Sequence, residues 1–302
     1  MRRLIVVYNP RSSRYADVRR DVLDRVKELN GYMVGKFEVK KVDIEENIAD
    51  LSRILKDGDL VISAGGDATG VIAANGVLKS GKDVTLAVLP YGNFNDFACT
   101  LRTKTIDDVL GKKAKEVKYY PLEIFVDGEF FRYATCYVTI GMMAGAVYIY
   151  DQPRMRRKLK KSFGRNITSY TVLMKWYFKN RHKKKFLPEF YLNGKRQDNR
   201  ASDYVAMNGG AMARVMRGRI DYLDKRIFRR EVGRLTSFWE LFKIMYKSIL
   251  IRIPGKETTG DMLEFVQHST VELQAEGEHK KFENISKIEV KKGKRCLKVI
   301  TI

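Results

Sequence analysis

The strongest chemical signal in the sequence is a glycine turn directly after a short apolar run. Residues 59–69 read DLVISAGGDAT, so Gly65 and Gly66 follow the run, and Asp67 and Thr69 come next. Paired glycines let a backbone approach a phosphate, and a following helix offers free N–H groups and the positive end of its dipole. Asp67 could hold a Mg²⁺ that bridges phosphate oxygens, with Thr69 donating a hydrogen bond to them. For this motif alone, a purely structural turn with Asp67 as helix N-cap stays open.

Two further polar loops follow other apolar runs. The first comes after Leu4–Tyr8, and the second comes after the run that ends at Leu89. Their candidate ligand residues are Asn9, Pro10 and Ser12 in the first loop, and Asn93, Asn95 and Asp96 in the second. Ligands of parallel α/β sheets bind at the carboxyl ends of the strands. Three such loops therefore predict one phosphate-binding crevice.

The elements that would position these loops alternate between strand and helix over the first 120 or so residues. We expect strands at 4–8, 37–42, 59–63 and 84–89, and helices at 15–29, 45–55 and 69–78. Alternating strands and helices predict βαβ units and a mostly parallel sheet. From about residue 122, tight turns such as Asp127-Gly128 and Asn193-Gly194 alternate with short strands, which predicts a β-rich second domain. Its expected strands include the two arms of a first hairpin, at 123–126 and 130–139, and two later strands, at 262–267 and 269–274. Two helical insertions are expected in it, at about 151–182 and 235–250.

Composition restricts the class of protein and of partner. The chain has 302 residues and a formal net charge of +22, which favours polyanionic partners. Its three cysteines form no C-x-x-C pair and its three histidines share no ligand spacing, so neither a disulfide framework nor a histidine metal centre is expected. We expect a reduced, intracellular setting and a buried first strand rather than a signal peptide. No run of 18 apolar residues occurs, so any membrane contact would be peripheral.

Much of the positive charge lies in one segment. Residues 151–185 contain 13 Lys or Arg and a single acid, Asp151. Within 154–185 the basic clusters flank an aromatic stretch, Trp176, Tyr177 and Phe178, as expected for a helix or helical hairpin on an anionic membrane surface. A basic stretch at 214–234 and an aromatic run at 238–250 would extend that face. A solvated basic face over ordinary core residues is the alternative.

The three loops resemble those of the diacylglycerol kinase catalytic domain family, which includes soluble bacterial lipid kinases and sphingosine kinases. The family's loops read N-P-x-S-G, G-G-D-G-T and P-x-G-T-x-N-D-F-A, in this order and at similar spacing, and its late D-G-E is matched here by Glu276-Gly277-Glu278. The resemblance spans nearly the whole chain. It implies an N-terminal Rossmann-like, three-layer α/β domain at 1–121 and a β-sandwich lipid-substrate domain at 122–285 with a basic helical insertion. C-terminal strands at 286–302 would return to the first domain, as in the NAD kinase and diacylglycerol kinase fold.

The resemblance also implies a function. It implies a cytoplasmic, peripherally membrane-associated lipid kinase that transfers the γ-phosphate of ATP, with Mg²⁺, to the hydroxyl of a diacylglycerol-like lipid. The glycine turn, Asp67 and Thr69 would hold the ATP phosphates, with Asn9 and Ser12 beside them, and Asp67 would hold the metal. Glu278 matches the general base. The oligomeric state stays open between a monomer and a homodimer.

Several positions depart from the family pattern. Ala68 replaces a glycine, which costs on the order of 1 kcal/mol if that position needs a positive φ. Asn93 and Phe94 replace threonine and glycine, and Glu276 replaces an aspartate. Arg217 stands where an aspartate usually holds a structural Mg²⁺, so we expect that second metal site to be lost. A catalytically degenerate member that binds lipid or nucleotide is therefore an alternative.

Two other classes of protein share some of these sequence features. The net charge would suit a nucleic-acid-binding protein, but the chain has no helix-turn-helix, zinc-finger or RNA-recognition signature, and the three loops would go unexplained. We therefore expect no nucleic acid partner. A relative of the NAD kinases would share the Gly-Gly-Asp turn, but it would not need the basic, aromatic segment.

Overall fold

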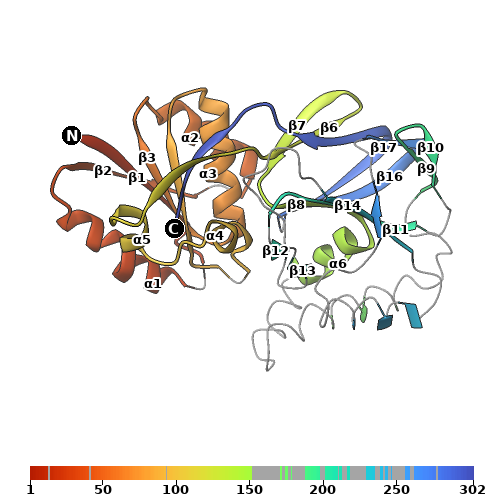
Figure 1. Ribbon diagram of the computed structural model, residues 1–302, viewed down its shortest axis with the longest axis horizontal. Coiled ribbons are helices and arrows are strands. Elements are labelled where there is room, and N and C mark those ends of the chain that lie inside the picture. The colour runs from red at the N-terminus through yellow and green to blue at the C-terminus, as the bar shows by residue number, and fades with distance from the viewer. Residues whose placement is uncertain are drawn as a thin grey trace. The chain divides into compact units, whose positions relative to one another are not determined.

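The computed structural model describes residues 1–151 except 13, 41 and 93, residues 188–197, 201–209, 211–212, 216–217, 229–234, 256–258, 262–302 except 277, and positions 171, 174, 175, 178, 239, 240, 242, 243 and 246. The chain divides into two units (Figure 1). One contains Met1–Pro121 and Lys292–Ile302, and the other contains Leu122–Ile220 and Arg226–Lys291. The first is built on a mostly parallel sheet and the second on an antiparallel one, which confirms the predicted fold class.

The sheet of the first unit has the strand order β2-β1-β3-β4-β18-β5. Its strands are β1 (Arg2–Tyr8), β2 (Tyr32–Glu38), β3 (Leu60–Gly65), β4 (Thr85–Pro90), β5 (Lys115–Tyr119) and β18 (Leu297–Thr301). The strand β18 comes from the far end of the sequence and inserts between β4, to which it runs parallel, and β5, to which it runs antiparallel. The sheet therefore needs both ends of the described chain.

Helices cover both faces of this sheet. They are α1 (Tyr15–Val18), the π-helical turn η1 (Arg19–Leu23), the 3₁₀ turn η2 (Arg25–Glu28), α2 (Ile44–Ile54), α3 (Asp67–Ser80), α4 (Asp96–Leu101) and α5 (Ile106–Leu110). On one face, Leu4 of β1 and Ile62 of β3 pack in a single apolar cluster with Val22 of η1 and Ile106 of α5. On the other face α3 packs on β3 and β4, with α2 against it (Figure 1). Every residue of β3 is buried, as expected for a central strand of a three-layer domain.

Local sequence explains where several of these helices begin and end. The Asp43 carboxylate accepts hydrogen bonds from the N–H groups of Glu45 and Glu46 and so starts α2. Thr105 and Asp108 form a reciprocal capping box at the start of α5. Gly81, with φ at +65°, ends α3 in the left-handed conformation that glycine adopts without strain.

The second unit is an antiparallel sheet whose main path is β15-β14-β11-β8-β16-β17-β6-β7. Its strands are β6 (Leu122–Val126), β7 (Glu129–Ala134), β8 (Tyr137–Gly141), β9 (Phe190–Leu192), β10 (Lys195–Arg196), β11 (Ala201–Met207), β14 (Arg229–Arg234), β15 (Lys256–Thr258), β16 (Met262–Ala275) and β17 (Glu278–Lys292). The short pair β12 (Ala211–Met212) and β13 (Met216–Arg217) forms a sheet of its own. Apolar residues of β6, β8, β9, β11, β16 and β17 pack into one core, so the sheet wraps around its own interior. The helix α6 (Met142–Asp151) packs on β8 and β16 (Figure 1).

Some predicted elements differ from the structure. The second strand is β2 at Tyr32–Glu38 rather than 37–42, because it pairs in register with β1 and Val42 is left 91% exposed. The predicted second arm of the first hairpin is two strands, β7 and β8, since Thr135 and Cys136 between them bond to other segments. The two strands expected at 262–274 are the single strand β16, whose pairing with β17 shifts register near Ser269. The short elements α4, α5, β5 and α6 were not predicted.

The return of the chain to the first unit also lies later than expected. The boundary was placed at 286, but β17 continues to Lys292 and pairs with β16 as far as Glu289. The helical insertions at 151–182 and 235–250 fall mostly outside the described residues, and so do the basic clusters. The described helices include none long and apolar enough to cross a membrane.

Candidate functional site

The three candidate loops lie side by side at the carboxyl ends of three adjacent strands of the first sheet. The strand β3 pairs with β1 on one side and β4 on the other, all parallel, with Tyr8 opposite Ala64 and Gly65 opposite Pro90. The loops that begin at Asn9, Gly66 and Tyr91 therefore all leave the sheet at the carboxyl ends of its strands. The structure thus brings the predicted loop residues together.

Glycines allow the second and third loops to touch. A Cβ on Gly92 would overlap the Cα of Gly66, and it would lie 2.9 Å from the Asn95 side-chain oxygen. A Cβ on Gly65 would overlap the side chain of Thr69, which is itself buried. The N–H of Tyr91 donates to the Gly65 carbonyl at 3.0 Å. A side chain on Gly92 would thus push these two backbones apart, and one on Gly65 would displace the Thr69 side chain.

Asp67 joins the same two loops through its carboxylate. One oxygen accepts the N–H of Asn95 at 3.1 Å, and the other accepts the N–H of Asp96 at 2.8 Å. Gly66, not Asp67, is the N-cap of α3, so the N-cap role considered for Asp67 is wrong. Its carboxylate instead binds the backbone at the start of α4.

The third loop is held in shape by Asn95. This residue has φ at +58°, a left-handed conformation that asparagine tolerates better than most residues. Its side chain accepts the N–H of Gly92 at 2.6 Å and donates to the Gly92 carbonyl at 2.9 Å. Asp96, which follows it, is 2% exposed. Asn93 lies outside the described residues, so its predicted contact with nucleotide stays a prediction.

The first loop is a tight turn with a buried hydroxyl. Asn9 accepts the N–H of Arg11 through its side chain at 2.9 Å, and its carbonyl accepts the N–H of Ser12 at 3.1 Å. The Ser12 hydroxyl oxygen is buried and has no hydrogen-bond partner among the residues that the structure describes. A buried polar atom of this kind usually finds a partner, here one that the described residues do not supply.

Arg14 links the first loop to the third, which the sequence did not indicate. Its guanidinium donates to the Pro90 carbonyl at 3.0 Å, lies over the Tyr91 ring at 5.3 Å, and pairs with Asp17 at 2.8 Å. Burial, followed by the nearby charge of Asp21, raises the pKa of Tyr91 to about 12. The Tyr91 phenol therefore stays neutral at any physiological pH and serves as a packing surface.

The predicted general base lies in the second unit. Glu278 is half-buried and is the first residue of β17, opposite Ala275 at the end of β16. Glu276, two residues earlier, is 4% exposed, and it bonds to the Thr135 hydroxyl and the Cys136 N–H. Sequence reasoning found Glu276 only as a longer replacement for an aspartate and missed these contacts, because Thr135 is distant in sequence.

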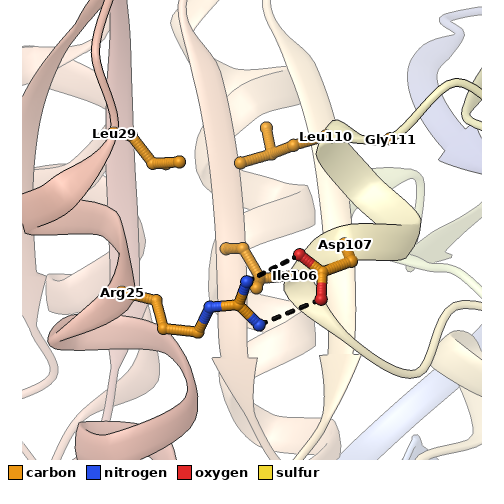
Figure 2. A pocket seen from close by; sticks show the side chains of 6 residues that line it. All are labelled: Arg25, Leu29, Ile106, Asp107, Leu110 and Gly111. Carbon is orange, nitrogen blue, oxygen red and sulfur yellow. Dashed lines mark hydrogen bonds and ion pairs between the residues drawn. The ribbon is translucent and has the colours of Figure 1, made fainter.

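A shallow cavity of about 140 Å³ lies elsewhere on the first unit, between η2 and α5 (Figure 2). It is lined by Arg25, Leu29, Ile106, Asp107, Leu110 and Gly111. Figure 2 shows Arg25 and Asp107 joined across it by two hydrogen bonds of 2.9 Å. Both side chains are largely exposed, so this pair adds little to stability. The cavity contains none of the predicted loop residues.

Comparison with known proteins matches the same region. Residues 3–119 match the family model of the diacylglycerol kinase catalytic domain. Diacylglycerol kinases from two strains of Staphylococcus epidermidis, ATCC 35984 and ATCC 12228, are each 28% identical to this chain over 151 residues. Each alignment covers 49% of this chain and 42% of the relative. The chain therefore aligns with less than half the length of these relatives.

Solved structures match the fold over the whole chain. A crystal structure of a diacylglycerol kinase from Bacillus anthracis str. Sterne has a TM-score of 0.62 at 14% identity, covering 100% of this chain and 97% of the other. A candidate diacylglycerol kinase from the same organism has a TM-score of 0.68 at 16% identity, with the same coverage. At such identity the likeness concerns fold alone. Residues 3–119 are thus similar in sequence to the diacylglycerol kinase catalytic domain, and the whole chain shares the fold of these solved structures.

Proposed function

We propose that this protein is an ATP-dependent lipid kinase that transfers the γ-phosphate to the hydroxyl of a diacylglycerol-like lipid. One observation carries the proposal: three loops leave the parallel sheet side by side at the carboxyl ends of β1, β3 and β4, and the second and third of them touch through Gly66 and Gly92. They lie within the matched catalytic domain. The family match supports a kinase, and we propose in addition that the acceptor is a lipid.

The nucleotide end of the reaction would use the first unit. The backbone N–H groups near Gly65 and Gly66, with the positive end of the α3 dipole, suit the negative charge of a triphosphate. The buried Ser12 hydroxyl can donate to a phosphate oxygen, and Asn9 shapes the turn that carries it. Asn93 and Thr69 are proposed as further contacts from neighbouring positions.

The residues present fit one Mg²⁺ held jointly with the nucleotide. Among the described residues no three carboxylate, histidine or cysteine side chains gather into a metal site. Mg²⁺ in kinases is commonly held by one or two carboxylates plus substrate phosphates. Asp67 can serve in this way, since a carboxylate oxygen that accepts one N–H keeps lone-pair capacity. When bound, Mg²⁺ neutralises the charge that develops on the phosphate oxygens.

Glu278 is proposed as the general base. Its carboxylate would take the proton of the lipid hydroxyl while that oxygen forms a bond to the γ-phosphorus. The bond between the γ-phosphorus and the bridging oxygen breaks, and ADP leaves with that oxygen. The loops would contribute by fixing the phosphates in place, because positioning supplies much of the rate in phosphoryl transfer.

Peripheral contact with an anionic membrane is the second part of the proposal. Trp239, Phe242 and Tyr246 are in helical conformation and are 69%, 51% and 56% exposed. Their spacing of three and four residues is that of one helical face. Exposed aromatic rings beside many basic residues are typical of a helix that lies in a membrane interface. The basic segment at 154–185 would supply the attraction to anionic lipids.

A catalytically degenerate, nucleotide-binding member is the competing function. Of the departures that suggest it, Ala68 carries little weight, because it is the second residue of α3 and is not among the described residues with positive φ. It therefore needs no glycine. Arg217 lies in β13, but most of the segment around it lies outside the described residues. The loss of a second metal site there stays a prediction.

Phosphate transfer from Mg-ATP to a panel of acceptors tests the proposal. We expect transfer to diacylglycerol or another lipid alcohol in mixed micelles and none to NAD. Asp67→Ala should abolish transfer, because it removes the metal ligand and both bonds to the third loop. Asp50→Ala on α2, which removes a surface carboxylate paired with Arg53, is the matched control and should stay active.

Two results would count against this function. Transfer to no lipid by a folded wild type that still binds Mg-ATP, measured by calorimetry, would favour the degenerate member. Unchanged turnover in Asp67→Ala, with thermal unfolding like that of wild type, would remove the metal assignment.

A further inference from the structure

The turn that carries Glu278 has an unusual backbone conformation. The strand β16 ends at Ala275 and β17 begins at Glu278, and these two residues lie opposite each other where the hairpin closes. Glu276 has φ at +50°. Two-residue hairpin turns that need a positive φ are dominated by asparagine, aspartate and glycine, and a glutamate there is disfavoured. Something else in the molecule must therefore hold this residue.

The side chain of Glu276 provides that hold. It is 4% exposed, and one carboxylate oxygen accepts hydrogen bonds from both the Thr135 hydroxyl and the Cys136 N–H. Thr135 and Cys136 are fully buried and connect β7 to β8. A shorter aspartate on the same backbone would end about one methylene short of these donors.

The segment that Glu276 binds is itself fixed. The Asn208 side chain donates to the Thr135 carbonyl at 2.9 Å, and the Asn208 N–H donates to the Cys136 carbonyl at 2.7 Å. Gly209 adds a third bond, also to the Cys136 carbonyl, at 2.9 Å. Asn208 is fully buried. The carboxylate is thus attached to a rigid part of the core rather than to a mobile loop.

This arrangement is energetically less favourable than another turn that could close the same hairpin. Burying a carboxylate is unfavourable unless its bonds compensate, and a positive φ at a long side chain adds backbone strain. An Asn-Gly pair, as at Asn193-Gly194 in this same unit, closes a hairpin without either cost. Strain and a buried charge two residues from a proposed base indicate a demand on the position of that base.

We propose that Glu276 is the positioning residue of the site: its buried carboxylate locks the β16–β17 turn and so fixes the direction of Glu278. The proposal rests on the function proposed above, in which Glu278 is the base. Glu276 itself is buried against Thr135 and Cys136, so we assign it no role in the chemical step.

Four variants separate positioning from plain stability. Glu276→Asp shortens the carboxylate and Thr135→Val removes one of its two donors, so both weaken the contact, whereas Glu276→Gln keeps an acceptor oxygen at full length. Gln274→Ala is the matched control, since Gln274 is a buried polar residue of the same strand, bonded to Thr139 at 2.8 Å and Tyr137 at 3.2 Å. Every variant is expected to melt at a lower temperature than wild type.

The kinetic readout is the kcat for lipid phosphorylation. We expect Glu276→Asp and Thr135→Val to lower kcat by roughly ten- to a hundredfold, with the KM for Mg-ATP unchanged. Glu276→Gln and Gln274→Ala should stay within a few-fold of wild type. Equal kcat in Glu276→Asp and Gln274→Ala would overturn the inference, while Glu278→Gln tests the base independently.

Hydrogen exchange gives a readout that needs no activity. The Cys136 amide, which donates to Glu276, should lose protection in Glu276→Asp and keep it in Glu276→Gln. Equal protection in both variants would overturn the lock. If the wild type phosphorylates no lipid while this exchange pattern holds, the proposed function fails and the structural lock does not.

Discussion

At the scale of single residues, the site depends on glycines that lack a side chain as much as on the polar side chains around them. Gly66 and Gly92 have no Cβ, and only for that reason can the second and third loops lie in contact. Asp67 then reaches across the contact to the N–H groups of Asn95 and Asp96. The loops thus behave as one structure.

Gly92→Ala tests this contact. The added Cβ would overlap the Gly66 Cα, so we expect the loops to separate, at a cost of about 1–3 kcal/mol in the free energy of unfolding. Mg-ATP affinity should fall with it. Chemical denaturation and calorimetry measure the two effects.

Gly70→Ala is the control for this substitution. Gly70 lies in α3, and a Cβ there would meet only a Val88 methyl group at 3.9 Å. Since alanine is the better helix former, we expect stability to rise by about 0.5–1 kcal/mol with nucleotide affinity unchanged. If both glycine variants behave alike, the close approach of the loops is unimportant.

Residue types alone identified the three loops, because each has glycine or short polar residues directly after an apolar run. They did not indicate Arg14, whose contacts with Pro90 and Tyr91 join the first loop to the third. An arginine in a sequence with 58 Lys and Arg carries no signal of its own. Only the fold shows which of them faces a loop.

At the scale of elements, a turn of the second unit makes hydrogen bonds that hold neighbouring strands together. Asp127, in the turn between β6 and β7, has φ at +49°, and its carboxylate accepts hydrogen bonds from the Ser286 N–H, the Ser286 hydroxyl and the Lys287 N–H. One turn thereby fixes the hairpin to β17. Burial raises the pKa of Asp127, but the hydrogen bonds from Ser286 and Lys287 outweigh it and lower the pKa below its ordinary value.

This shift predicts a pH dependence of stability. Because the folded-state pKa is the lower one, the carboxylate stabilises the fold above the unfolded-state pKa, and the contribution is lost as pH falls through the folded-state pKa. Asp127→Asn should therefore be less stable than wild type at pH 7, with the difference shrinking below about pH 4. Urea unfolding between pH 3 and 7 measures it.

Glu129→Gln is the matched control in the same hairpin, since the Glu129 side chain is exposed and makes no hydrogen bond within the described residues. Its stability relative to wild type should vary little with pH. A difference for Asp127→Asn that stays constant from pH 3 to 7 would contradict the linkage.

Elements with strong local signals were predicted, and those set by distant partners were not. The turns at Asp127-Gly128 and Asn193-Gly194 were predicted because their types need residues that tolerate positive φ. The strand β5 was missed because its lysine-rich sequence has little strand character, and it forms by pairing with β18. The helix α6 was missed because its glycine-containing apolar run, MMAGAVYIYD, reads equally as strand.

At the scale of the whole molecule, the order of the motifs along the chain predicted the fold, since the two sheets follow the change from βαβ alternation to hairpins. The charge distribution predicts a polyanionic partner, and this stays a prediction because the basic clusters lie outside the described residues. The aromatic positions Trp239, Phe242 and Tyr246 are described, and they allow a sharper test of membrane contact.

Replacing Trp239, Phe242 and Tyr246 together by alanine should weaken binding to phosphatidylglycerol vesicles by roughly tenfold or more at every salt concentration, because apolar burial is lost.

Reversing the charges of Arg156, Arg157, Lys160 and Lys161 should weaken binding to the same vesicles and flatten its salt dependence, since each cation adds about 1 kcal/mol at an anionic surface. Vesicle sedimentation over a salt series separates the two.

Met33→Ala, which removes an exposed apolar side chain from β2 in the first unit, is the control and should bind like wild type. Full binding by both test variants would show that another face meets the membrane.

The position of β18 has a consequence for biosynthesis. A ribosome makes β1 to β5 first, yet β4 and β5 gain their shared neighbour only when residues 297–301 emerge, after all of the second unit. Until then, the nascent first sheet keeps two unpaired strand edges, and exposed edges invite association with other chains. Residues 3–119, which match the family model, are thus synthesised well before the sheet that contains them can be completed.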